Sequence, residues 1–106
     1  MHEIPETMAQ AEALATKLAW PLDKVIQRGI QNWAQQLLDE GVEGGYLTAK
    51  LEADGLHVFD INNQPLLTVA TLTSDALVTR FKTESHATLL AVQTKIRELF
   101  DTNQLH

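Results

Sequence analysis

The sequence predicts an α+β fold with an N-terminal helical hairpin, an antiparallel meander sheet of three or four strands, and a C-terminal helix. Apolar residues recur every three or four positions over residues 5–41 and 83–100, which is the period of an amphipathic helix. Between these segments apolar and polar residues alternate, and turn-forming pairs interrupt the alternation, as in strands joined by tight turns. A chain of 106 residues is expected to form one domain, so 1–106 is treated as a single α+β domain.

Composition narrows the classes of protein to consider. The hydrophobic fraction of 44% and the charged fraction of 21% are typical of a globular protein. The absence of cysteine excludes disulfides, thiolate metal sites and cysteine nucleophiles. No apolar run approaches the roughly 18 residues of a membrane span, and MHEIPETMAQAEALA lacks the basic region and apolar block of a signal peptide. We therefore expect a cytoplasmic protein with no membrane partner.

The first helix is expected to run from Pro5 to about Leu18. Proline suits the first helical turn, because the N–H that it lacks has no helical partner there. Trp20 precedes Pro21, and a residue before proline is pushed out of the helical region. The first helix should therefore end just before this pair.

A second helix is expected from Pro21 to Gly41, with proline near its start and glycine just past its end. Its apolar stripe comprises Leu22, Val25, Ile26, Ile30, Trp33 and Leu37. Gly29 falls on the same stripe, which predicts that another segment of the chain crosses closely there. The alternative is a glycine that is merely tolerated, at about 1 kcal/mol relative to alanine.

Three strands are expected within YLTAKLEA, LHVFDI and LLTVATL. Asp54-Gly55 predicts a two-residue hairpin turn between the first two strands, and this register places Glu52 opposite His57. Residues 76–82 are ambiguous, and their β-branched and aromatic content favours a fourth strand over a short helix. The last helix is expected to open near residues 83–85 and to end near Phe100, with DTNQLH fraying.

The alternation places a complete apolar layer on one face of the sheet. The other face is mixed at one end and apolar at the other, where it carries Tyr46, Phe59, Ile61, Leu66 and Leu72. Soluble monomers rarely expose a contiguous apolar patch of more than a few hundred Å². In one arrangement the helices divide between the two faces of the sheet, cover both and give a monomer. In the other, all helices pack on one face and the second face of the sheet binds a partner. The second arrangement is favoured, and these five residues are then the predicted interface.

Few residues are placed to carry chemistry. His57 beside Glu52 could form an acid–base pair, but cross-strand polar pairs are common on half-exposed sheet faces. The sequence contains no nucleophile elbow, phosphate-binding loop, dinucleotide-binding motif or zinc-protease motif. We therefore predict that the chain is not an enzyme and has no catalytic residue, metal or cofactor. A small-molecule site near Trp33 is a weaker third possibility.

The stretch ALATKLAWPLDKVIQRGIQNWAQQLLDEG is similar in its cadence to the winged helix-turn-helix family, with a helix of small residues, a short turn, a second helix and then a hairpin. The resemblance implies that residues 21–40 form a recognition helix in the major groove of DNA. Its contacts would come from Lys24, Gln27, Arg28 and Gln31. However, the hairpin tip EADG is acidic, and a net charge of −6 opposes binding to phosphates. DNA binding is therefore kept only as the alternative.

The sequence thus predicts a small cytoplasmic module that binds another protein, as an adapter, an inhibitor or immunity protein, or a regulatory subunit. The partner is either another copy of the chain, giving a homodimer through the second sheet face, or a protein that the sequence does not identify.

Overall fold

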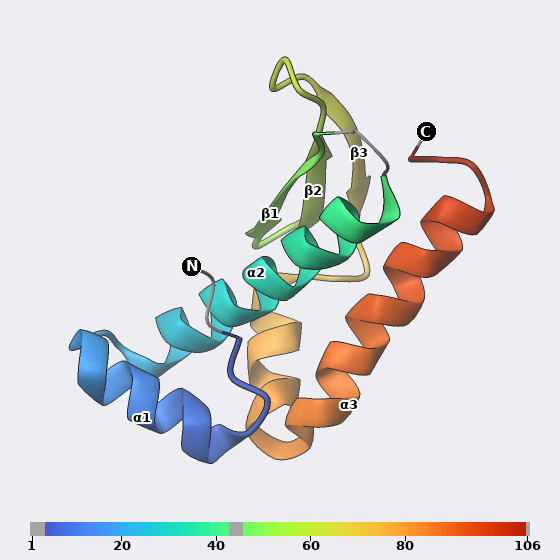
Figure 1. The fold of residues 1–106 in the computed structure, drawn as a ribbon. Coiled ribbons are helices and arrows are strands. Elements are labelled where there is room, and N and C mark those ends of the chain that lie inside the picture. The colour runs from blue at the N-terminus through green and yellow to red at the C-terminus, as the bar shows by residue number, and fades with distance from the viewer. Residues whose placement is uncertain (1–3, 43–45, 106) are drawn as a thin grey trace.

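The computed structural model describes residues 4–42 and 46–105 and has the predicted α+β architecture (Figure 1). The element order along the chain is α1 (Met8–Leu18), α2 (Leu22–Gly41), β1 (Thr48–Glu52), β2 (Gly55–Phe59), β3 (Pro65–Val69) and α3 (Ser74–Asp101). The three strands form an antiparallel sheet in the order β1-β2-β3. In Figure 1 the sheet lies above α2 and α3, and α1 lies at the opposite end of the molecule.

The helix α1 begins at Met8 rather than at Pro5. The Thr7 hydroxyl accepts a hydrogen bond from the Gln10 N–H at 3.2 Å, which is the arrangement of a helix N-cap. Pro5 is instead buried against α2, where a Cβ added at Gly29 would lie 2.7 Å from the Pro5 Cδ. The close crossing predicted at Gly29 is therefore confirmed, and the Pro5 ring is what fills the notch.

The end of α1 and the extent of α2 agree with the sequence pattern. Ala19 adopts a left-handed conformation with φ 55° and donates its N–H to the last turn of α1, as a helix C-cap does. The helix α2 then turns one apolar face inward. Its buried residues are Val25, Ile26, Gly29, Ile30, Ala34, Leu37 and Leu38.

The β1–β2 turn differs by one residue from the prediction. Glu52 pairs with Gly55, so the turn consists of Ala53 and Asp54. Gly55 instead begins β2 with φ 138°, and a Cβ at this position would lie 2.4 Å from the Val69 carbonyl oxygen. The glycine is required here because β3 approaches its backbone closely.

This shift changes the pairing but not the faces of the sheet. Leu51 pairs with Leu56, and His57 pairs with Lys50 rather than with the predicted Glu52. Because the pairing shifts by two residues, which is the side-chain period of a strand, each paired side chain keeps its predicted face. The inner face, which packs on the helices, comprises Leu47, Ala49, Leu51, Leu56, Val58, Leu67 and Val69.

Residues 76–82 are helical, so the prediction of a fourth strand is wrong. The Thr73 hydroxyl accepts a hydrogen bond from the Ala76 N–H at 3.4 Å and caps the start of α3. Leu77, Val78 and Phe81 are all buried, although neighbours in a strand would point to opposite faces. The cap and the burial of this one helical face outweigh the β-branched content.

The predicted last helix is the second half of α3. Glu84 has non-helical dihedral angles of −139° and 59°, which kink α3 close to the predicted opening at residues 83–85. Figure 1 shows the two halves of α3 at an angle to each other. Past the helix, Leu105 is only 2% exposed, so the predicted fraying of the last residues does not extend to this side chain.

The helices α2 and α3 share one core with the inner face of the sheet, and α1 packs on α2 and α3. The core joins the inner face to side chains of α2 and α3, and its largest fully buried members include Phe81, Ile26, Ile30, Leu51 and Ile96. Exposed and buried residues alternate along β1, and Ala49 and Leu51 are the buried ones. The helices therefore leave the outer face of the sheet uncovered.

Candidate functional site

The outer face of the sheet carries an apolar cluster at one end, next to the β2–β3 turn. Tyr46, Ile61 and Leu66 are 67%, 68% and 47% exposed, and Phe59 is half-buried among them. Phe59 on β2 pairs with Thr48 of β1 and with Pro65 of β3, Leu66 lies on β3, Tyr46 precedes β1, and Ile61 lies in the β2–β3 turn. We call Tyr46, Phe59, Ile61 and Leu66 the outer sheet patch.

The fifth predicted interface residue lies elsewhere. Leu72 is 7% exposed and belongs to the hydrophobic core. The chain turns after β3, with the Leu72 N–H donating to the Val69 carbonyl at 3.1 Å. This turn carries Leu72 inward, so it contributes nothing to the outer sheet patch.

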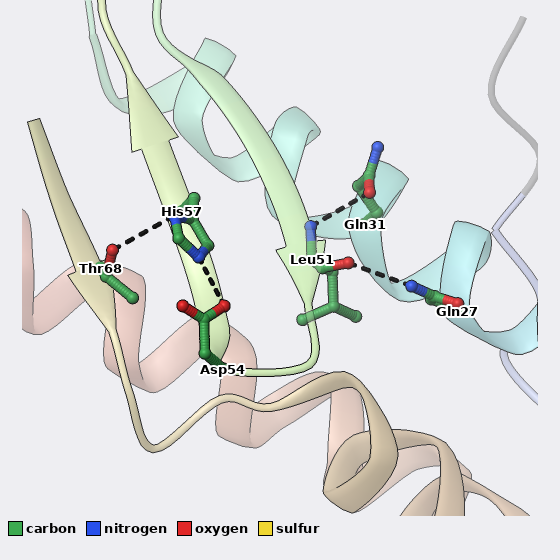
Figure 2. Close-up of polar contacts among 6 residues, drawn as sticks. All are labelled: Gln27, Gln31, Leu51, Asp54, His57 and Thr68. Carbon is green, nitrogen blue, oxygen red and sulfur yellow. Dashed lines mark hydrogen bonds and ion pairs between the residues drawn. The ribbon is translucent and has the colours of Figure 1, made fainter. Parts of the chain in front are cut away.

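The other end of the outer face carries a polar row. His57 Nε2 lies 2.7 Å from Asp54 Oδ1, and His57 Nδ1 lies 3.3 Å from the Thr68 hydroxyl (Figure 2). The His57 and Phe59 rings stack with their centroids 6.1 Å apart. Lys50 Nζ lies 5.0 Å from the centroid of the Phe59 ring. The hydrogen bond with His57 lowers the pKa of Asp54 below its ordinary value of 3.8.

A carboxylate, an imidazole and a hydroxyl in a row resemble the groups of a hydrolytic triad. The Asp54 side chain is 71% exposed, however, and the row lies on an open sheet face rather than in a water-excluded site, where such electrostatics gain their strength. We interpret the row as structural hydrogen bonds that link the β1–β2 turn, β2 and β3. The predicted pairing of His57 with Glu52 is replaced by these two contacts.

The edge of β1 that does not pair with β2 is hydrogen-bonded by glutamine side chains of α2, an arrangement that we call the glutamine seal. Gln35 Oε1 accepts from the Ala49 N–H at 2.9 Å, and its Nε2 donates to the Leu47 carbonyl at 2.8 Å. Gln31 Oε1 accepts from the Leu51 N–H at 3.1 Å, and Gln27 Nε2 donates to the Leu51 carbonyl at 3.0 Å (Figure 2). The edge of β1 that faces away from β2 therefore has its hydrogen bonds supplied from within the chain.

The spacing of the glutamines explains this fit. Four residues of a helix rise about 6.0 Å, and two residues of a strand rise about 6.8 Å. Gln31 and Gln35 can therefore reach the N–H groups of Leu51 and Ala49 in turn, and Gln27 reaches the carbonyl of Leu51. The helix and the strand run in opposite directions, because Gln31 meets Leu51 while Gln35 meets Ala49.

The opposite edge of the sheet, on β3, has no such seal among the described residues. Antiparallel strands alternate between residues that bond one neighbour and residues that bond the other. The N–H groups of Ala49 and Leu51 face α2, so Leu56 and Val58 of β2 face β3, where they pair with Val69 and Leu67.

The Asp60 N–H, which donates to the Gln64 carbonyl at 3.0 Å, has the same direction as the N–H groups of β2 that face β3. Leu67 and Val69 therefore use their N–H and C=O groups on β2. By the same alternation, the N–H and C=O groups of Thr68 point away from the sheet, whereas a register shift between Val58 and Phe59 interrupts the alternation at Leu66.

The residues of the predicted DNA-binding set do lie together. They line a cleft of about 420 Å³, whose walls comprise Trp20, Lys24, Gln27, Arg28, Gln31, Leu51 and Glu52. Lys24 Nζ lies 4.4 Å from the centroid of the Trp20 ring. Two of the four, Gln27 and Gln31, are bonded to Leu51, so this face of α2 packs against the sheet. A recognition helix needs that face free to enter the major groove, and the geometry therefore gives DNA binding no support.

Sequence reasoning missed the glutamine seal and the polar row. The spacing of Gln27, Gln31 and Gln35 at intervals of four is a visible signal, but amides on a helix face are commonly just solvated. The polar row was missed because the predicted register of the hairpin placed Glu52, and not Asp54 and Thr68, beside His57. Near Trp33, where a small-molecule site was a further possibility, the indole N–H donates to the Leu89 carbonyl at 2.9 Å and joins α2 to α3.

Comparisons with protein family models, with curated proteins and with solved structures gave no match for this chain. Within residues 4–42 and 46–105, no cluster of three or more His, Cys, Asp or Glu side chains is arranged to hold a metal ion. In the same part of the chain, no helix has the length and apolar character needed to cross a membrane.

Proposed function

We propose that the chain is a small cytoplasmic protein-binding module, acting as an adapter, an inhibitor or immunity protein, or a regulatory subunit, and that it is not an enzyme. The outer sheet patch is the contact surface. The observation that carries the proposal is the exposure of three large apolar side chains, Tyr46, Ile61 and Leu66, on and beside the strands of the sheet.

The chemistry of the outer sheet patch fits a protein partner. Aromatic residues are enriched at the centres of protein interfaces, and charged residues are depleted there. Phe59 lies on the central strand β2, with the exposed members of the patch on the neighbouring segments. Binding would be driven by burial of these side chains at about 25 cal/mol per Å² of apolar area, less the cost of association.

The test compares two substitutions that introduce the same charge on different surfaces. Phe59→Glu alters the centre of the outer sheet patch, and Leu90→Glu alters a 45% exposed leucine of α3 that lies outside it. Wild type and both variants are immobilised and used to capture proteins from the source cells, with quantitative mass spectrometry and with circular dichroism as a check of folding. We expect one or more proteins to be retained by wild type and by Leu90→Glu but lost with Phe59→Glu.

A partner retained equally by all three proteins would overturn the assignment of the outer sheet patch, and so would the absence of any retained protein. Phe59 is half-buried, so Ile61→Glu serves as a second variant if Phe59→Glu does not fold. Ile61 is 68% exposed, and its replacement should leave the core intact.

A further inference from the structure

We propose that the cleft between the first half of α2 and the end of β1 binds a small organic anion, a monocarboxylate with a flat apolar part. The cleft measures about 420 Å³, which lies within the range of roughly 300–1,000 Å³ of small-molecule sites. It shares no residue with the outer sheet patch, so this second site goes beyond the proposed function and is independent of the protein-binding surface.

Two cations in the cleft have no carboxylate partner. Lys24 and Arg28 lie one turn apart on α2, and like charges at this spacing repel each other. Acidic residues outnumber basic ones in this chain, but no acidic residue of the described part forms an ion pair with either cation. Arg80, Lys82 and Lys95, by contrast, each pair with a carboxylate. An anion bound between Lys24 and Arg28 would remove their repulsion.

The polar groups of the cleft are held in place by other contacts. Lys24 Nζ lies 4.4 Å from the centroid of the Trp20 ring, and this cation–π contact positions the ammonium group. Gln31 is fixed because its Oε1 accepts from the Leu51 N–H at 3.1 Å, and its Nε2 points away from Leu51 (Figure 2). This nitrogen has no hydrogen-bond partner among the described residues, none of which has a buried polar side-chain atom left unpaired. It is therefore accessible as a donor, and groups that are already ordered lower the cost of binding.

The charges around the cleft favour a monoanion. The walls carry the cations Lys24 and Arg28 and one carboxylate, Glu52, which leaves one positive charge for a ligand to neutralise. A second negative charge, as on the dianion of inorganic phosphate, would lie in the same cleft as Glu52 without a cation to balance it. The guanidinium group of Arg28 has parallel N–H groups that match the two oxygens of a carboxylate.

Trp20 gives the cleft an apolar wall. It lies in the connection between α1 and α2 and is 36% exposed. Its indole ring is flat, and aromatic rings pack on such a surface in offset or edge-to-face contacts. A carboxylate joined directly to an aromatic ring can place its charge near Lys24 and Arg28 and its ring against Trp20. Benzoate is the simplest molecule of this class and serves as the probe.

Nuclear magnetic resonance of the full-length protein tests the site. Benzoate is titrated near neutral pH while the Trp20 indole N–H and the Gln31 side-chain amide are followed. The internal references are the Trp33 indole N–H, which donates to the Leu89 carbonyl, and the side-chain amide of Gln36 on the exposed face of α2. We expect saturable shifts at Trp20 and Gln31 and none at the references, with a dissociation constant on the order of 1 mM.

Two arginine variants remove the same charge from different surfaces. Arg28→Gln alters the cleft, and Arg97→Gln alters an exposed arginine of α3 that lies outside it. We expect Arg28→Gln to weaken benzoate binding by at least about 10-fold, because it removes charge-assisted hydrogen bonds, and Arg97→Gln to leave it unchanged. Arg28 is exposed, and Lys24→Gln is the second variant if Arg28→Gln does not fold.

Two further ligands separate the carboxylate from the ring. Benzamide keeps the ring without the charge, and acetate keeps the charge without the ring. We expect each to bind at least about 10-fold more weakly than benzoate, since each lacks one of the two contacts.

Several results would overturn the inference. The absence of saturable shifts at Trp20 and Gln31 excludes the site, and equal weakening by Arg28→Gln and Arg97→Gln reduces binding to the overall charge of the chain. Benzamide that binds as tightly as benzoate excludes recognition of a carboxylate, and acetate that does so excludes the flat apolar part. Tighter binding of inorganic phosphate excludes the preference for a monoanion. None of these results affects the capture experiment with Phe59→Glu, which tests the outer sheet patch alone.

Discussion

The two edges of the sheet, on β1 and on β3, both present backbone N–H and C=O groups, but side chains bond these groups at β1 and not at β3 among the described residues. At β1, the amides of Gln27, Gln31 and Gln35 occupy the outward N–H and C=O groups. At β3, the alternation of the ladder leaves the groups of Thr68 directed outward without such side chains, and a bulge at Leu66 interrupts the strand. The glutamine face of α2 packs along β1, so in this chain a helix protects one edge while the other stays available.

The difference shows that the polarity of a helix face does not reveal what that face does. Gln36 bonds only to Glu40 of its own helix, at 3.2 Å, on an exposed surface. Its neighbour Gln35 supplies two bonds to β1 from a half-buried position. The same residue type is therefore a solvated surface group at one position and part of the sheet at the next.

The largest expected loss of stability comes from placing proline at a residue of β3 whose N–H faces β2, compared with proline at a residue whose N–H faces outward. Leu67→Pro removes an N–H that faces β2 and places a proline ring against the neighbouring strand, so we expect a loss of at least about 2 kcal/mol of unfolding free energy. Thr68→Pro removes an N–H that faces outward, and we expect it to lower stability by less than about 1 kcal/mol. Urea unfolding of both variants at a concentration where each is monomeric makes the comparison. Equal losses would contradict the assigned direction of the β3 backbone.

A smaller effect is expected from opening the sealed edge. Gln35→Leu leaves the Ala49 N–H and the Leu47 carbonyl without their side-chain partners, and we expect a loss of about 1–2 kcal/mol. Gln36→Leu is the matched control and should be close to neutral. Denaturant unfolding gives the energies, and faster hydrogen exchange of the Ala49 amide locates the change. If Gln36→Leu destabilises the chain as much as Gln35→Leu does, the seal has no special role.

The smallest expected effect is a pH dependence of the free energy of unfolding, which comes from Asp54 in the polar row of Asp54, His57 and Thr68. The pKa of Asp54 is lowered in the folded chain by the hydrogen bond with His57, so the carboxylate stabilises the folded state at pH values above its ordinary pKa of 3.8. This contribution is lost as the pH falls through the lowered value. Unfolding of wild type and Asp54→Asn, compared from about pH 6 to pH 2, should show a difference that shrinks on acidification. Parallel curves through this range would rule out the contribution of the pair.

Much of the fold and part of the candidate site could be predicted before the structure was known. The periods of the apolar residues set the order of the elements, and the parity of the strands set which side chains share a face. The faces were predicted correctly despite an error of one residue in the position of the hairpin turn, because that error shifts the pairing by two residues. The four members of the outer sheet patch were all among the five predicted residues, and the fifth, Leu72, is buried because the chain turns inward after β3.

The sequence by itself determined the α+β class, the inner and outer faces of the sheet and the notch at Gly29, because local periodicity and side-chain size carry this information. Only the tertiary structure decided that residues 76–82 are helical, that Gly55 serves the approach of β3, and that the glutamines of α2 belong to the edge of β1. Each of these depends on contacts between segments far apart in the chain, such as Gln27 with Leu51. A single-sequence pattern does not record which distant backbone groups a side chain will reach, and these contacts leave one edge of the sheet closed and the other open.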